Sequence, residues 1–213
     1  MNDLTPSDVF KENGFVGIHG VLTKEEINII TNYCLIQEKT ITSEVPDYLI
    51  NRTYYNDPQS PGAFSTYGDP LMESLLIHIQ PIIEQCTGLE LYPTYSYYRV
   101  YRNGHDLFKH KDRESCEISV SLALGYSYDT EKYQWPLYVG ENEIIMEPGD
   151  MVIYSGTEMF HWRDSFNIDE PAYHIQVFLH YVDANGPYKE YKYDNREFIG
   201  ARSRKENLSN LSL

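Results

Sequence analysis

The sequence predicts an α+β fold in which helices pack outside a sandwich or barrel of antiparallel strands. Two early segments carry apolar side chains at helical spacing, from Lys24 to about Gln37 and from Pro70 to Gly88. From residue 89 onward the apolar period changes to two, and short turns separate one strand-like run from the next. At 213 residues the chain is most simply a single domain that buries its own core.

Local signals mark the ends of both predicted helices. Thr23 and Glu26 form a capping box, because the threonine hydroxyl can cap an early helical amide while the glutamate reaches back. Asp69 is a strong N-cap residue followed by a proline at the first helical position, and Gly88 is a typical helix end. We therefore predict that these helices cover a sheet.

The stretch between the helices, residues 40–67, contains several prolines and reads as irregular. A loop of this length in a compact domain is either a functional element or a solvated connector. In the functional interpretation the loop forms a lid over a binding site. Its candidate substrate contacts are then Arg52, Tyr54 and Tyr55.

The remaining organisation follows from the strand pattern. Residues 1–90 form a largely helical lead-in, which includes a short apolar strand at 15–22. Residues 91–183 form the sheet core, and 184–213 form a polar tail whose last residues, from 201, are predicted to be disordered. The core strands are predicted at 91–101, 118–124, 137–139, 143–146, 151–154 and 174–182.

Charge and cysteine content exclude several classes of protein. A net charge of −15, from 32 acidic and 17 basic side chains, repels phosphate groups and argues against binding to nucleic acids or anionic membranes. No run reaches the roughly 18 apolar residues of a membrane span, so we expect a soluble, cytoplasmic protein. Its oligomeric state is not predicted. The three cysteines, expected to be buried free thiols, are Cys34, Cys86 and Cys116.

Two histidines and one carboxylate form a candidate metal centre. His110 and Asp112 make a His-x-Asp pair at the end of a strand-like run, where alternate residues share a face. His161 follows a Pro-Gly-Asp turn and an apolar run, a position that returns to the same end of the barrel in a jelly roll. Two imidazoles and one carboxylate on one side of an ion leave the other positions open, which is the ligand set of a non-heme Fe(II) centre.

These residues, with their neighbours, resemble the prolyl 4-hydroxylase-like branch of the Fe(II)/2-oxoglutarate-dependent dioxygenases. The resemblance covers about residues 97–182, and the lead-in from residue 13 also resembles that of phytanoyl-CoA-hydroxylase-like members. It rests on Tyr101-Arg102-Asn103-Gly104, Leu107, His110-Lys111-Asp112, the strand at 118–124, Gly149-Asp150 and His161.

The resemblance implies a double-stranded β-helix, or jelly roll, and a reaction in which a C–H bond is hydroxylated with release of succinate and CO2. It implies Fe(II) as cofactor, O2 and 2-oxoglutarate as cosubstrates, and ascorbate as a further ligand. The keto acid chelates the metal through its 2-oxo and 1-carboxylate groups. Tyr101 stands where the family has a tyrosine that hydrogen-bonds 2-oxoglutarate.

The sequence departs from the family at the far carboxylate of 2-oxoglutarate. Prolyl-hydroxylase relatives place a Lys or Arg where Pro171 stands, and the chain has neither residue from 164 to 187. A buried carboxylate needs a cationic or multiply donating partner. We therefore assign this role to Arg163, the nearest guanidinium, with His174 or Gln176 assisting.

The substrate is less closely defined than the reaction. The leading hypothesis is a prolyl or other peptidyl side chain, and the first alternative is a free small molecule. A metal- or sugar-binding jelly roll without redox chemistry is the binding-protein alternative, and oxidation of nucleobases is disfavoured by the negative charge. Candidate substrate contacts are Tyr98, Arg113, Trp135 and Trp162.

Overall fold

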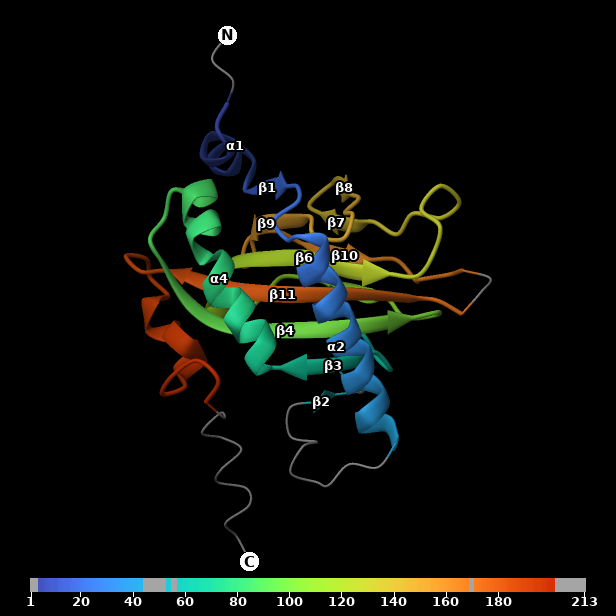
Figure 1. The fold of residues 1–213 in the computed structure, drawn as a ribbon. Coiled ribbons are helices and arrows are strands. Elements are labelled where there is room, and N and C mark those ends of the chain that lie inside the picture. The colour runs from blue at the N-terminus through green and yellow to red at the C-terminus, as the bar shows by residue number, and fades with distance from the viewer. Residues whose placement is uncertain (1–3, 44–52, 55–56, 169–170, 202–213) are drawn as a thin grey trace, which may run out of the picture.

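The fold is a sandwich of two antiparallel sheets with helices on the outer face of the larger one (Figure 1). The computed structural model describes residues 4–43, 53–54, 57–168 and 171–201, with only the backbone described for 42–43 and 53–54. The larger sheet has seven strands in the order β1-β9-β6-β11-β4-β3-β2, and the smaller has four in the order β5-β10-β7-β8.

The eight strands of the core pass from one sheet to the other at every step except β7 to β8, which form a hairpin within the small sheet. In the large sheet they are β4 (Leu91–Arg102), β6 (Ile118–Tyr126), β9 (Met151–Ser155) and β11 (Tyr173–Asp183). In the small sheet they are β5 (Leu107–His110), β7 (Leu137–Val139), β8 (Asn142–Ile144) and β10 (His161–Arg163).

The lead-in adds strands to the large sheet as well as helices to its face. The short strand β1 pairs with β9, and β3 pairs with β4, so both edges of the core sheet are extended. The helices α2 and α4 lie across this sheet (Figure 1). The lead-in elements are α1 (Pro6–Asn13), β1 (Phe15–Ile18), α2 (Lys24–Ser43), β2 (Thr53–Tyr54), β3 (Phe64–Tyr67) and α4 (Pro70–Thr87).

The predicted caps of the two long helices are present. Thr23 and Glu26 bond each other reciprocally, with the Glu26 amide donating to Thr23 Oγ1 over 3.3 Å. The Asp69 carboxylate accepts from the amides of Leu71 and Met72, and the chain leaves the helix through Gly88 at φ +74°. These local bonds fix where both helices begin and where α4 ends before any packing is considered.

The period of two along β11 divides the interior into two environments. Ile175, Val177 and Leu179 face the helices and join one large apolar core. The intervening side chains, among them Gln176 and His180, are also buried but face the space between the sheets. The helix-covered core is the largest apolar cluster, and burial of apolar area is the dominant favourable term in folding. The inter-sheet space holds polar side chains together with two smaller apolar clusters.

Several elements differ from the sequence prediction. Helix α1 was not predicted, although Thr5 and Asp8 form a capping box at its start. The strands β2, β3, β5 and β10 were also missed, because none of them consists of an uninterrupted run of apolar side chains. The equally short β7 (Leu-Tyr-Val) does consist of such a run, and it was predicted. Helix α2 continues to Ser43, beyond the predicted end near residue 37. The predicted burial of all three cysteines as free thiols is confirmed.

The polar tail packs against the large sheet through ion pairs. Its 3-10 segment η2 (Lys189–Asn195) contacts β4 and β11, and Arg196 beyond it donates to the buried Glu73 carboxylate over 2.6 Å. Residues 193–195 all have positive φ, which costs energy for side chains with a Cβ. The ion pairs therefore hold this strained turn in place. Residues 202–213, for which disorder was predicted, lie outside the described part.

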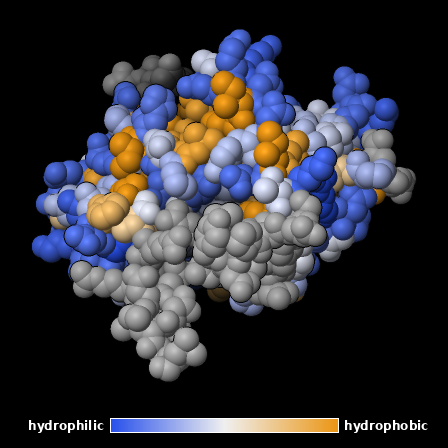
Figure 2. Space-filling model, turned by 60° about the horizontal axis from the view of Figure 1, so that its bottom comes forward, coloured by the Kyte–Doolittle hydropathy of each residue, from blue (hydrophilic) through white to orange (hydrophobic). Residues whose placement is uncertain are grey.

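The face shown in Figure 2 carries hydrophilic side chains around a patch of apolar ones. A groove between α2 and α4 is lined mainly by apolar residues, and Ile29 on α2 is an exposed apolar side chain. Within the described part of the chain, no helix combines the length and apolar character needed to cross a membrane.

The buried pair Arg196–Glu73 provides a test of how the tail is attached. Replacing Arg196 by methionine leaves the Glu73 carboxylate buried without its cation, so the free energy of unfolding should fall by about 3–5 kcal/mol. Urea denaturation measures this change. The matched control is Lys132→Ala, which removes an exposed ion pair with Asp129 and should change stability by about 0.5 kcal/mol or less. Equal effects of the two substitutions would show that the tail is not anchored by this pair.

Candidate functional site

Strand pairing brings the three predicted metal ligands together. His161, the first residue of β10, lies directly opposite His110, the last residue of β5. Asp112 follows two residues after His110, and its Oδ1 lies 3.6 Å from Nε2 of each histidine. The three ligand atoms all lie within 4.8 Å of one another. They therefore form one compact group, open on one side, with the two imidazoles and one carboxylate of a facial Fe(II) site.

Bonds outside this group orient its side chains. His110 Nδ1 lies 2.6 Å from the Phe108 carbonyl oxygen, and His161 Nδ1 lies 3.2 Å from that of Met159. Because a carbonyl can only accept, each Nδ1 carries the proton, and each Nε2 presents a lone pair towards Asp112. This is the tautomer that metal ligation needs. The residues present therefore fit a divalent metal ion.

The Asp112 carboxylate is held by a second set of contacts. Its Oδ2 accepts a hydrogen bond of 2.6 Å from Ser119 Oγ, and its backbone amide donates to the Gly156 carbonyl. A Cβ added at Gly156 would stand 2.2 Å from the Cys116 carbonyl oxygen and 2.7 Å from Asp112 Oδ2. Only glycine fits at this position, so the turn after β9 helps to place the carboxylate.

The charge state of the group follows from burial and from its own members. Burial by itself raises the pKa of Asp112, but the neighbouring His110, His161 and His180 and the hydrogen bond from Ser119 lower it more, to about 2. Burial lowers the pKa of His161, against the opposing effect of Asp112. At neutral pH the carboxylate is ionised and His161 is neutral, which is the form that binds a cation.

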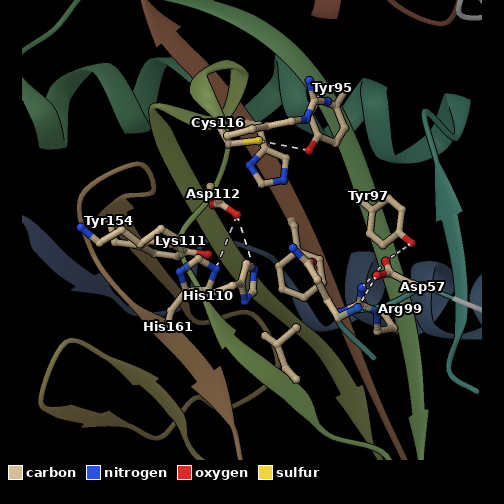
Figure 3. A pocket seen from close by; sticks show the side chains of 15 residues that line it. Asp57, Tyr95, Tyr97, Arg99, His110, Lys111, Asp112, Cys116, Tyr154 and His161 are labelled. Carbon is tan, nitrogen blue, oxygen red and sulfur yellow. Dashed lines mark hydrogen bonds and ion pairs between the residues drawn. The ribbon is translucent and has the colours of Figure 1, made fainter. Parts of the chain in front are cut away.

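A cavity of about 260 Å³ opens beside these three residues, between the two sheets (Figure 3). The exposed Lys111 and Arg113 lie at its rim, and Arg99 from β4 lies at the other side, as Figure 3 shows. The cavity is lined by Asp57, Gln59, Tyr95, Tyr97, Arg99, Leu107, His110, Lys111, Asp112, Arg113, Cys116, Tyr154, His161, Phe178 and His180.

Arg99 is the buried cation of this cavity. Its guanidinium donates to Ser65 Oγ, to the Tyr101 hydroxyl and, over 2.7 Å, to the Asp57 carboxylate. These bonds use three of the five N–H groups of an arginine, and the structure assigns no partner to the other two among the described residues. The Tyr97 hydroxyl donates to the same Asp57 oxygen. The site therefore already holds one carboxylate and has donors left for another.

The residues predicted to hold the far carboxylate form a separate buried group. Arg163 donates to the Trp135 carbonyl and to Gln176 Oε1, and His174 Nε2 lies 2.9 Å from the same oxygen. Arg163 has no ion pair among the described residues, its Nε has no hydrogen-bond partner there, and its burial lowers its pKa. None of these residues lines the cavity. Tyr101 lies between the two groups, with its ring on Trp135 and its hydroxyl on Arg99.

The candidate substrate contacts are scattered. Tyr98 lies on the opposite face of β4, within the helix-covered core, and Trp162 stacks on Tyr138 outside the cavity. Arg113 does line the cavity, where Asp194 holds its guanidinium through two hydrogen bonds. The proposed lid contacts are not placed: Arg52 and Tyr55 lie outside the described residues, as does the Tyr54 side chain.

Most of the cavity wall was not predicted from the sequence, although the period of two along β4 indicated part of it. Tyr101 was assigned to the cosubstrate, and the period of two along the strand puts Arg99, Tyr97 and Tyr95 on the same face as Tyr101. Asp57 and Cys116 carried no such signal, because they lie outside the strands and reach the cavity through tertiary packing alone.

Comparison with solved structures identifies the fold. No protein-family model matches the chain, and no curated protein matches it. Among solved structures, the non-heme alpha-ketoglutarate-dependent carbocyclase SnoK from nogalamycin biosynthesis is similar, with a TM-score of 0.67, 14% identity and coverage of 99% of this chain and 92% of that one. The chain has the fold of the Fe(II)/2-oxoglutarate-dependent dioxygenases. The predicted jelly roll with helices outside is confirmed.

Two further dioxygenase structures show the range of likeness. EctD from S. alaskensis, solved with 2-oxoglutarate and 5-hydroxyectoine, has a TM-score of 0.64 at 13% identity, and the match covers 95% of this chain and 86% of the EctD chain. The prolyl-4-hydroxylase of Pseudomonas putida has a TM-score of 0.55 at 16% identity, and the match covers 82% of this chain and 96% of the hydroxylase chain. The same fold thus occurs in a protein that binds a small molecule and in one that hydroxylates prolyl groups.

Burial of His180 makes the stability of the metal-free protein depend on pH. Burial lowers the pKa of its imidazole from an ordinary 6.5 to about 4, so between these values the unfolded state binds more protons than the folded state. Stability should therefore fall as the pH decreases through this range. In His180→Asn that loss should be smaller by about 3 kcal/mol, as measured by urea denaturation at a series of pH values.

The matched control is His78→Asn, which removes an exposed imidazole from α4. This variant should lose stability on acidification as the wild-type protein does. If His180→Asn loses as much stability as His78→Asn, then His180 is not held neutral by burial.

Proposed function

We propose that the protein is an Fe(II)- and 2-oxoglutarate-dependent dioxygenase that hydroxylates a C–H bond and releases succinate and CO2. The observation that carries this proposal is the His110, Asp112 and His161 group, with both Nε2 atoms 3.6 Å from the same carboxylate oxygen and a cavity on its open side. The same three residues carry the prediction from sequence, which expected them to meet at one end of the barrel.

The three side chains would hold Fe(II) and leave three positions of an octahedral ion free. These positions would be available to the 2-oxo and 1-carboxylate oxygens of the cosubstrate and to O2. When bound, the metal would supply the activation of O2 for hydroxylation. The Nδ1–H bonds to backbone carbonyls keep both imidazoles in the liganding tautomer. Tyr154 packs on the His161 ring at 4.8 Å and excludes water from that side.

We propose Arg99 as the residue that binds the far carboxylate of 2-oxoglutarate. It lines the same cavity as the metal ligands and retains two N–H donors, and the adjacent Tyr97 and Asp57 show that a carboxylate can be held beside it. Arg163, assigned from the sequence with His174 and Gln176, is the alternative, because it is a buried cation without a carboxylate partner among the described residues.

Two substrate classes fit the cavity. A volume of about 260 Å³ must hold the cosubstrate and the reacting part of the substrate, so only a side chain or a small molecule can enter. A prolyl or other peptidyl side chain is the hypothesis from the sequence resemblance. A free small molecule is supported by the fold likeness to the carbocyclase and to the structure that holds 5-hydroxyectoine.

The reaction class is tested by succinate release from 2-oxoglutarate with Fe(II), O2 and ascorbate, the last being the reductant that the family resemblance implies. We expect slow release without substrate and faster release with the correct substrate, screened among proline-containing peptides and free small molecules. His110→Ala and Asp112→Ala should reduce release to the background without protein. His78→Ala, at an exposed position, should leave it unchanged.

Iron binding without succinate release under any of these conditions would contradict the proposal. It would instead support the alternative of a jelly roll that binds metal without redox chemistry.

Matched substitutions distinguish the two candidate carboxylate partners. Lysine keeps the charge of arginine but loses the planar pair of donors. Arg99→Lys should raise the KM for 2-oxoglutarate by about 10- to 100-fold, as expected for the loss of one charge-assisted bond, with little change in kcat. Arg163→Lys should change the KM by about 3-fold or less. The reverse result would assign the carboxylate to Arg163.

A further inference from the structure

One cysteine and one tyrosine meet in the wall of the cavity, beside the proposed metal ligands. The Tyr95 hydroxyl, from β4, lies 3.1 Å from Sγ of Cys116, the last residue of the 3-10 turn η1 (Glu114–Cys116). Both side chains are buried, and both line the cavity that the His110 and His161 side chains also line. Figure 3 shows this contact directly above Asp112.

The Tyr95 ring is fixed in this position from several sides. It stacks on Tyr67 with the ring centroids 4.9 Å apart, and His180 lies 4.6 Å from it. The guanidinium of Arg113 lies over the ring at 4.8 Å. A ring held in this way keeps the same edge towards Cys116, so the contact is preorganised rather than transient.

The pair lies within reach of the proposed oxygen chemistry. A carboxylate oxygen of Asp112, Sγ of Cys116 and a ring nitrogen of His180 all lie within 4.8 Å of one another. The same carboxylate belongs to the proposed metal ligands. An oxidant produced at that site without a substrate to attack would meet the phenol and the thiol among its nearest protein groups.

Other roles for Cys116 fit the structure less well. A disulfide has no partner among the described cysteines, because Cys34 and Cys86 both belong to the helix-covered core. The group that Cys116 touches is a phenol, and a thiol adds to an oxidised phenol ring.

We propose that Cys116 and Tyr95 become joined by a thioether bond between Sγ and the ring carbon next to the hydroxyl. This inference rests on the proposed function, since the oxidant comes from turnover of 2-oxoglutarate and O2 at the same site. One S–H and one ring C–H bond break and one C–S bond forms, so the protein loses two hydrogen atoms (two protons and two electrons). One oxygen atom of O2 enters succinate as CO2 leaves, and the other takes the two hydrogens as water.

The bond would link β4 covalently to the turn η1, which begins two residues after Asp112. It would thereby hold the Asp112 carboxylate at a constant distance from the barrel wall. It would also remove an oxidisable thiol from beside an oxygen-activating centre.

The test is peptide mass analysis of the metal-free protein before and after incubation with Fe(II), 2-oxoglutarate and O2, with succinate measured in the same samples. We expect the wild-type protein to become lighter by two hydrogen atoms, with Tyr95 and Cys116 in one joined peptide that survives thiol reductants. Omitting iron should prevent the change. Cys116→Ala and Tyr95→Phe should prevent it as well, while Cys86→Ala, which removes another buried cysteine, should not.

Each outcome decides between the two proposals. Succinate release with an unchanged mass, or with an added oxygen atom instead of the loss of two hydrogens, overturns the thioether and leaves the dioxygenase function standing. The absence of succinate together with an unchanged mass overturns both. The wild-type comparison with and without iron needs no substitution, so the test holds even if a Cys116 variant fails to fold.

Discussion

The whole site depends on the antiparallel pairing of two short strands, β5 and β10. This pairing sets His161 opposite His110, although they lie far apart in the chain, and the next two residues after His110 bring Asp112 to the same point. Backbone hydrogen bonds fix such a register, and a slip of one residue would turn each side chain to the other face. Local strand geometry thus sets the positions of all three proposed ligands, and the side chains need only the right rotamers.

The largest apolar core lies outside the jelly roll, between the helices and the large sheet. The helices bury the outer face of that sheet, and this face supplies the main hydrophobic stabilisation. The space between the sheets holds two smaller apolar clusters together with Arg99, Arg163, Gln176 and His174, which would be costly in a core without hydrogen-bond partners. Gln176 bonds both Arg163 and His174, and Arg99 bonds Ser65, Tyr101 and Asp57. Most of the stabilising apolar burial is thus on the face that does not line the cavity.

The rim of the cavity is held by residues far along the chain. Arg113 lies between the Tyr95 ring and the carboxylate of Asp194, and Asp194 belongs to the turn with positive φ that Arg196 and Glu73 anchor. A strained backbone persists only where its surroundings over-determine it, and here two ion pairs do so. The tail is thereby part of the site: it fixes the orientation of a cation at the cavity mouth, while η1 and Cys116 fix the wall beneath it.

The sequence by itself determined the fold class, the caps of α2 and α4, and the residues His110, Asp112 and His161. The fold class and the caps depend on periodicity and local hydrogen bonds, and the His110–Asp112 pair on a local motif, all of which are properties of neighbouring residues. His161 was chosen because of the turn and the apolar run that precede it. Only the tertiary structure decided that Arg99 rather than Arg163 lines the cavity, that Tyr98 faces the core, and that Tyr95 meets Cys116. The physical reason is that contacts between segments depend on register and on strand order, which no single segment specifies. The strand β10 was missed for a related cause, since His161 and Arg163 are polar and its strand forms only when partner strands supply the hydrogen bonds.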